Sequence, residues 1–328
     1  MNVPMSRLDI TLILEQLLTI SSRWRSLRIS FSVPPEFMKR LAEYAMDNLE
    51  EVDFYVHHSY NLPTTLSFGP APRLRKVSLG QDMHVCMPWS QLTDLDIHPH
   101  SPQVALDTLA QCNNLVTASV HTAAWAHPPQ STEFTLKHLR TLSLTFLDDN
   151  GQHFMPLLDH LSAPALEHLH LTLESNIIWM EAQFTDFQLR SPNITRLEME
   201  DVDLTSTDLR AVLSNTPSLT HLKLTYCPRS IDDTLFHTLL YQDGATPLVP
   251  RLHTLFLDLM SSTRIVFSED VLASMIASRW WKDTEPESSS RRAVARWTSV
   301  ELRREQWDFS RYFMGVVQSS GVKALTCM

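Results

Sequence analysis

One spacing of apolar residues recurs along the chain and limits the folds it can adopt. An apolar residue is followed by others three and five positions later, as Leu219, Leu222 and Leu224 are in SLTHLKLTYC. A helix would repeat its apolar positions at three and four residues, and a half-exposed strand at two. The ten sets begin at Trp24, Leu49, Leu74, Leu92, Leu115, Leu139, Leu166, Ile194, Leu219 and Leu252. The pattern therefore predicts a repeated structural unit.

The distance between successive sets indicates which kind of repeat this is. Most first positions lie 23 to 28 residues apart, within extremes of 18 and 33, and a leucine-rich repeat takes about 20 to 29. In such a unit two of the three apolar residues alternate along a short strand, and a small buried residue such as Cys227 suits the turn that ends it. Helical spacing follows in segments 104–112, 155–162, 208–215, 232–240 and 269–278. We predict an α/β leucine-rich-repeat solenoid, a curved horseshoe with parallel strands on the concave face and helices and loops on the convex face.

The remaining segments are assigned around the repeats. Residues 1–21 are expected to form an N-terminal capping helix, and residues 22–281 about ten repeats. The polar stretch 282–293 is expected to be a flexible loop, because it has too few apolar residues to pack. Residues 294–328 are expected to supply the last strand and a C-terminal capping helix.

Composition excludes several classes of protein. The 37 acidic residues exceed the 27 basic ones and give a net charge of −10, which argues against binding to nucleic acid. No apolar run reaches the roughly 18 residues that cross a bilayer, and no signal peptide is recognisable. We therefore expect no membrane partner and a cytoplasmic or nuclear location. Six scattered glycines do not form a phosphate-binding loop, and four widely spaced cysteines suggest reduced thiols.

The residues that alternate with the core leucines are the candidates for binding. Positions two, four and six after each first apolar residue should face the concave side, because neighbouring strand residues point to opposite faces. The candidate partner-binding residues there are Glu51, Asp53, Tyr55, Asp94, Asp96, His98, His121, His168, His170, Arg196, Glu198, His221 and Lys223. The first strands are acidic, the middle ones rich in hydroxyl groups, and the later ones mixed with histidine. A protein or peptide is the expected partner, with basic or polar segments facing the acidic part.

Neither catalysis nor metal binding is predicted. No spacing of Ser, His and Asp matches a catalytic motif, and stacked repeats form an open surface, so no enzyme and no catalytic or cofactor-binding residues are expected. His168 and His170 share a strand, but His121 and His221 lie two repeats away, roughly 10 Å off. Zinc ligands must converge at about 2 Å from the ion. His98 and His100 are expected to face solvent, and no metal or other cofactor is predicted.

Several phrases of the chain resemble one family. RWRSLRISF, PRLRKVSL, LKHLRTLSL and PSLTHLKLTYC are similar to the leucine-rich-repeat region of the F-box-like proteins of mushroom-forming (basidiomycete) fungi. The resemblance covers about Leu8 to Trp281. It implies an adaptor of a cullin-type ubiquitin ligase, in which an F-box binds a Skp-family protein and the repeats hold the substrate.

The F-box itself is the departure from that family. No LPxEIL-like segment precedes the RWRSL phrase, so a Skp-family partner is expected only if an F-box lies upstream. The alternatives are a repeat-only binding protein or a truncated gene product, neither linked to a ubiquitin ligase.

Overall fold

The chain divides into two compact units. Unit 1 comprises Met1–Ala123 and Thr135–Leu139, and unit 2 comprises Ala124–Phe134 and Arg140–Met328. The computed structural model describes residues 15–29, 40–41, 43–55, 66–68, 71–80, 85–126, 133–147, 153–173, 177–242, 244–259, 267–280, 294–303, 309–319 and 325–327. The predicted 282–293 loop lies outside these residues, as does most of the predicted N-terminal helix, of which residues 15–18 are helical.

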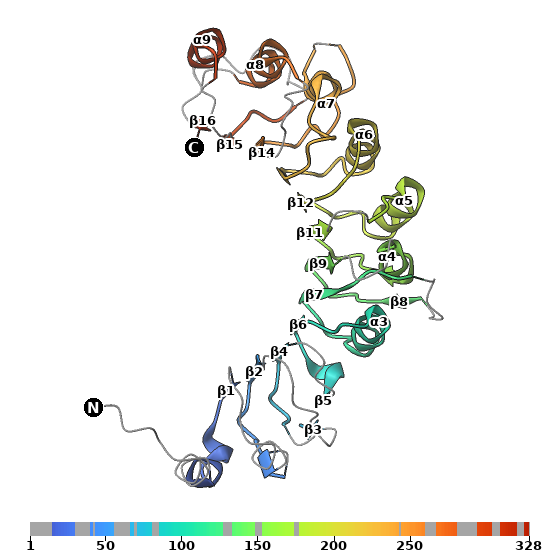
Figure 1. Cartoon of the computed structure of the whole chain (residues 1–328), viewed down its shortest axis with the longest axis vertical. Helices are drawn as coiled ribbons and strands as arrows, with labels where there is room; N and C mark the ends of the chain where they lie inside the picture. Colours follow the sequence, from blue (N-terminus) through green and yellow to red (C-terminus); the bar gives the residue numbers. More distant parts are fainter. Residues whose placement is uncertain are drawn as a thin grey trace, which may run out of the picture. The chain divides into compact units, whose positions relative to one another are not determined.

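Unit 1 is built on parallel strands that pair in chain order. They are β1 (Ser26–Ile29), β2 (Glu51–Phe54), β4 (Lys76–Leu79), β6 (Asp94–Ile97) and β7 (Thr117–Ala123) (Figure 1). Outside this sheet, the short strands β3 (Leu66–Ser67) and β5 (Val85–Cys86) pair with each other. Its helical elements include η1 (Ser21–Arg23), η2 (Trp89–Gln91) and α3 (Pro102–Gln111), and α3 contacts β7.

Unit 2 repeats the same arrangement, with an α-helix in each connection between successive strands of the sheet from β9 to β16. Its parallel strands are β9 (Thr141–Leu147), β11 (His168–Leu173), β12 (Arg196–Glu200), β13 (His221–Thr225), β14 (Thr254–Asp258), β15 (Ser299–Arg303) and β16 (Leu325–Cys327). Its helices are α4 (Met155–His160), α5 (Glu181–Arg190), α6 (Ser206–Ser214), α7 (Asp233–Leu239), α8 (Glu269–Ser278) and α9 (Arg311–Ser319). Each helix contacts the next, and within the unit they lie on one side of the strands (Figure 1). The short strands β8 (Phe134–Thr135) and β10 (Leu161–Ser162) lie outside the sheet.

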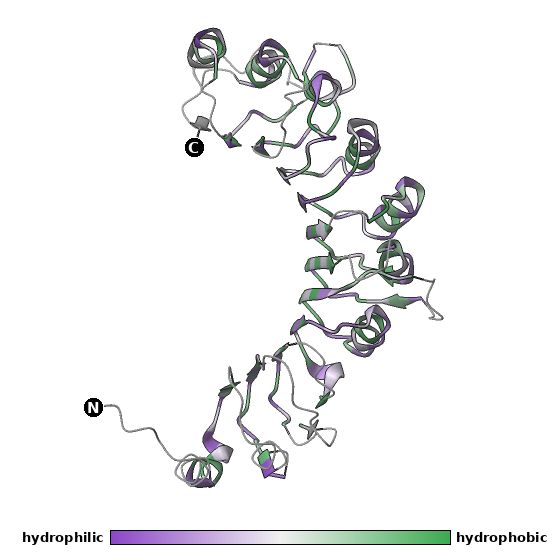
Figure 2. Cartoon of the chain, viewed as in Figure 1, coloured by the Kyte–Doolittle hydropathy of each residue, from purple (hydrophilic) through white to green (hydrophobic). Residues whose placement is uncertain are grey.

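The strand register confirms the predicted leucine pattern. In unit 2 the middle apolar residue of each set pairs with that of the next strand, in the series Leu142, Leu169, Leu197, Leu222 and Leu255. Val300 on β15 continues the register beyond the ten sets. Along β13, Leu222 and Leu224 are buried, whereas His221 and Lys223 are half-buried. Figure 2 shows the alternation as bands of two colours on β9 and β11. The α/β leucine-rich-repeat solenoid is therefore confirmed within each unit.

Polar side chains on either side of the first apolar residue form hydrogen bonds between a repeat and the preceding one. The amides of Asn48, Asn114 and Asn193 donate to the carbonyls of Ser22, Ser90 and Pro164 at 2.8, 2.7 and 2.7 Å. On the other side of that residue, the hydroxyls of Thr195 and Thr220 donate to backbone carbonyls of the preceding repeat. The carbonyls that accept from the two threonines also accept backbone N–H groups. Neighbouring repeats are therefore held by polar as well as apolar contacts.

Unit 2 contains a continuous row of aromatic rings. Neighbouring ring centroids lie 4.7 to 6.2 Å apart in the series Trp125, Phe146, Phe154, Trp179, Phe184 and Phe187. Phe184 and Phe187 are three residues apart on α5 and are both fully buried. Rings at these separations pack in tilted or edge-to-face geometry. The row joins α5 to the loops and strand that precede it.

Most predicted elements are present, and α5 and β16 are among the elements that were not predicted. Helices α3, α4, α6, α7 and α8 overlap the predicted segments, and Cys227 is fully buried as expected. Helix α5 was not predicted, because its N-cap Met180 gives no capping signal. The chain also does not close with a helix: β16 follows α9 and pairs with β15. Within the described residues, the helices are too short or too polar to span a bilayer.

Candidate functional site

Each sheet has a face formed by the strand residues that alternate with the buried ones, here called the open face. All thirteen predicted binding residues lie on strands of this face or directly after them, and each is exposed or half-buried. Unit 1 carries Glu51, Asp53, Tyr55, Asp94, Asp96, His98 and His121, and unit 2 carries His168, His170, Arg196, Glu198, His221 and Lys223. Polar groups on a pleated strand surface are spaced regularly and remain accessible.

The open face of unit 1 is less acidic than the predicted residues alone suggest. Arg28 on β1 forms an ion pair with Asp53, with Nε 2.7 Å from Oδ2, and Lys76 on β4 adds a second positive charge. The Arg28 side chain is 70% exposed and that of Asp53 23%. The surface of unit 1 is therefore mixed in charge, with Asp94 and Asp96 as the acidic pair on β6.

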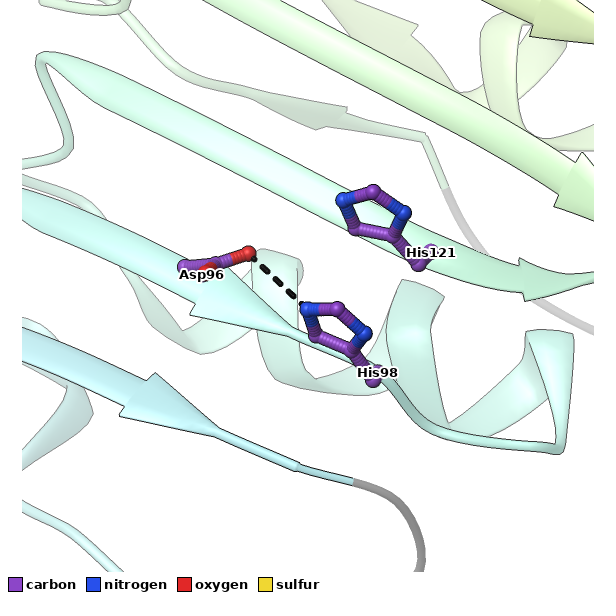
Figure 3. A group of neighbouring side chains, drawn as sticks. All are labelled: Asp96, His98 and His121. Carbon is purple, nitrogen blue, oxygen red and sulfur yellow. Dashed lines mark ion pairs between the residues drawn. The ribbon is translucent and has the colours of Figure 1, made fainter. Parts of the chain in front are cut away.

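Asp96, His98 and His121 form a cluster on neighbouring strands of unit 1. Because Asp96 pairs with Ser119 across β6 and β7, His98 lies opposite His121. The two imidazole rings stack with centroids 4.2 Å apart and an interplanar angle of 10°. His98 Nε2 lies 3.4 Å from Asp96 Oδ1 (Figure 3). One ligand atom from each of the three residues lies within 4.8 Å of the other two.

The surroundings keep the Asp96 carboxylate ionised. Burial by itself raises the pKa of Asp96, but His98, with smaller contributions from Ser119 and His121, outweighs burial and lowers it. Ser78 donates a hydrogen bond to Oδ2 of Asp96 at 3.3 Å. The cluster is thus an anion held beside two imidazoles.

In unit 2 the open face is organised around Glu198 on β12. Glu198 Oε2 lies 3.3 Å from Lys223 Nζ, and Glu198 Oε1 lies 3.8 Å from Arg196 Nε. The Lys223 ammonium also lies 5.7 Å from the centre of the Phe256 ring on β14, a cation–π contact. The side chains of Lys223 and Arg196 are each 43% exposed and that of Glu198 is 27% exposed, so a ligand can reach them.

Two histidines on the neighbouring strands lie beside this charged group: His170 pairs with Glu198 across β11 and β12, and His221 with Arg196 across β12 and β13. His170 Nε2 lies 3.6 Å from Glu200 Oε2, and the Ser143 hydroxyl lies 3.3 Å from His170 Nδ1. Burial lowers the pKa of His221, and the positive charge of Arg196 lowers it further, with smaller effects from His253 and His168. His221 therefore stays neutral to a lower pH than an exposed histidine.

The sixth position after the first apolar residue does not always belong to the open face. Thr225 on β13 and Asp258 on β14 occupy this position and are 8% and 1% exposed. Beyond β13, Tyr226 takes a positive φ of 52°, and the equivalent Asp201 after β12 one of 58°. The prediction for Thr225 and Asp258 was wrong: both are buried, whereas the equivalent Glu200 on β12 is 38% exposed.

A cavity lies at the C-terminal ends of β4 and β6 in unit 1. Its volume is about 560 Å³, and its wall includes Cys86, Trp89, His98, His100, Val104 and Asp107. This size falls in the range of small-molecule sites, although repeats were expected to form an open surface alone. His98 lines the cavity and also belongs to the three-residue cluster. The expectation that His98 simply faces solvent was therefore wrong.

The sequence does indicate that His98 and His121 are neighbours, although they lie 23 residues apart. His98 and His121 each stand six residues after the first apolar residue of consecutive repeats, Leu92 and Leu115. Equivalent positions on adjacent strands lie about 4.8 Å apart. The predicted grouping combined His121 with His168 and His221 from other repeats, and so overlooked its neighbour.

Comparison with known proteins adds little to this description. No protein-family model and no curated protein sequence matches the chain. One chain with similar structure comes from the crystal structure of a TLR13–ssRNA13 complex, with 11% sequence identity and a TM-score of 0.34. The match covers 86% of the present chain and 49% of that chain, so the present chain spans about half its length. The strand register and the alternating burial along each strand define the leucine-rich-repeat fold.

Proposed function

We propose that this chain is a protein-interaction scaffold that holds an extended polar segment of a partner protein on the open face. The supporting observation is the division of each strand: alternate residues fill the core, and the residues between them present charged and hydrogen-bonding groups. A partner segment lying across several strands would meet such groups at regular intervals.

The chemistry of unit 2 favours a partner segment with both signs of charge and an apolar or aromatic side chain. Arg196 and Lys223 would bind carboxylates, while Glu198, which lies between them, would accept from a basic group or a backbone amide. Phe256 is half-buried beside Lys223 and offers an aromatic contact within the charged surface. Aromatic residues and arginine are enriched among the residues that dominate binding energy.

Proximity labelling with matched variants tests the proposal. The full chain, fused to a biotin ligase, is compared with the double variant Arg196→Glu and Lys223→Glu and with the control Arg210→Glu, which reverses an exposed charge on α6. Proteins labelled by the wild type and by the control should be lost with the double variant, because repulsion would replace two attractive contacts. An unchanged set of labelled proteins in all three would contradict binding at this face.

The resemblance to the F-box-like family supports a narrower form of the proposal. In that form the partner is the substrate of a cullin-type ubiquitin ligase, and a Skp-family protein binds an F-box encoded upstream. Co-purification of a Skp-family protein with the chain extended by its upstream coding sequence would support the ligase adaptor. Partner binding without a Skp-family protein would instead support a repeat-only binding protein.

A further inference from the structure

The cluster of Asp96, His98 and His121 offers three ligand atoms of the types that transition metals prefer. Two imidazole nitrogens and one carboxylate oxygen approach one another within 4.8 Å. Figure 3 shows the two rings lying one above the other beside the Asp96 carboxylate. Imidazole suits Zn²⁺, Cu²⁺, Ni²⁺ and Fe²⁺, and carboxylate oxygen completes many such sites.

The separation of Asp96 from His98 fits two ligands of one metal ion. His98 Nε2 lies 3.4 Å from Asp96 Oδ1, where the two side chains form an ion pair without metal. Two ligands about 2.1 Å from one tetrahedral ion are about 3.4 Å apart. Asp96 Oδ1 has almost no exposed surface, although the Asp96 side chain as a whole is 43% exposed, and its partner is His98. A carboxylate oxygen beside an imidazole nitrogen offers one cation two ligand types.

Neighbouring hydroxyl groups orient the ligands. Ser78 donates to the other carboxylate oxygen, Oδ2, at 3.3 Å, so Oδ1 remains directed at His98. The Ser119 hydroxyl lies 3.3 Å from His121 Nε2 on the same strand. The bond from Ser78 leaves Oδ1 unobstructed and so can fix the orientation of the Asp96 ligand, and the Ser119 contact can do the same for His121 if the ion binds at Nδ1. Because an imidazole lone pair lies in the plane of its ring, a shared ion requires the His121 ring to rotate out of its 10° stack with His98.

We propose that Asp96, His98 and His121 bind one divalent transition-metal ion, with Zn²⁺ as the probe for the site. Three protein ligands leave a coordination position for water or for a group from a bound molecule. The inference concerns unit 1 alone and does not depend on the proposed partner site of unit 2.

Zinc titration of the purified full chain, freed of metal by a chelator, tests the site. Calorimetry should detect one Zn²⁺ per chain. His98→Phe and His121→Phe keep an aromatic ring in the stack but remove the ligand nitrogen, and each should weaken zinc binding at least about tenfold. Zinc at saturation should also raise the Tm of the wild type more than that of either variant, since only the native state binds it tightly.

Two further variants separate this site from other zinc binders. His168→Ala removes an open-face histidine of unit 2, and Cys86→Ser removes the exposed thiol of unit 1. Both should bind zinc as the wild type does, and the Co²⁺ complex should lack a thiolate charge-transfer band. The proposal is overturned if zinc binds without a single saturable site, if both phenylalanine variants keep wild-type affinity, or if Cys86→Ser abolishes binding.

Discussion

At the scale of single residues, one strand places groups of opposite character side by side. His221 and Lys223 on β13 reach solvent, whereas Leu222 between them is 1% exposed. The physical cause is the two-residue period of the strand, which sends neighbours to opposite faces. A function carried by His221 can therefore be altered without touching the core.

The titration of His221 provides a test of the contacts across β12 and β13. Its pKa is lowered by burial first and by Arg196 second. Because the folded pKa lies below the unfolded value of about 6.5, the associated stability is present above that pH and is lost as pH falls through the folded pKa. In Arg196→Ala the pKa of His221 should rise toward its ordinary value, as followed by NMR of the ring protons. Arg210→Ala on α6 should leave it in place, and an identical titration in both variants would contradict the described contact.

The cysteines provide a second test at this scale. Burial raises the pKa of Cys112 and of Cys227 to about 12. At pH 8 roughly one such thiol in ten thousand is the reactive thiolate. Iodoacetamide should modify exposed Cys86 in the folded protein and leave Cys112 and Cys227 intact, as read by peptide mass spectrometry. Labelling of Cys227 at the rate of Cys86 would show that β13 does not end in a buried turn.

At the scale of elements, helix α5 is stabilised by packing contacts, although its sequence has no N-capping signal. The helix has a single basic residue in its last turn, Arg190, which donates to the carbonyls of Leu158, Asp159 and Leu161 in the preceding repeat. Its apolar side enters the aromatic row through Phe184 and Phe187. The Arg190 contacts span 29 to 32 residues of sequence, and the aromatic row reaches the preceding repeat through the contact of Trp179 with Phe154.

Two substitutions on α5 separate packing from helix propensity. Phe184→Ala should lower the free energy of unfolding by about 3 to 5 kcal/mol, because it leaves a cavity between Trp179 and Phe187. Leu189→Ala on the same helix should change it by less than about 0.5 kcal/mol, since Leu189 is 68% exposed. Urea denaturation measures both. Equal effects would place the aromatic row outside the core.

The sequence predicted the strands well because their leucine spacing is fixed by the repeat. The sets that begin at Leu139, Leu166, Ile194 and Leu219 all align in register. The missed elements depend on distant partners: α5 on the aromatic row, and β16 on pairing with β15. The cluster of His98 and His121 was missed for a related reason, because 23 residues separate them in sequence while one strand spacing separates them in space.

At the scale of the molecule, both units use the same division of strand residues for stability and for recognition. Leucines in register hold the repeats together, and the asparagine and threonine hydrogen bonds fix their stacking. The side chains between the leucines do not pack in the core. This separation lets the open face differ in character: a carboxylate with two imidazoles in unit 1, and a charged group with an aromatic ring in unit 2.

Thiol accessibility along β13 tests this division most directly. Single variants His221→Cys, Leu222→Cys, Lys223→Cys and Leu224→Cys are made in a chain with Cys86 and Cys327 replaced by serine, and each is treated with a maleimide. The thiols at 221 and 223 should react in the folded protein, and those at 222 and 224 only after denaturation. Equal reactivity at all four positions, or protection at 221 and 223, would contradict the register on which the proposed open face depends.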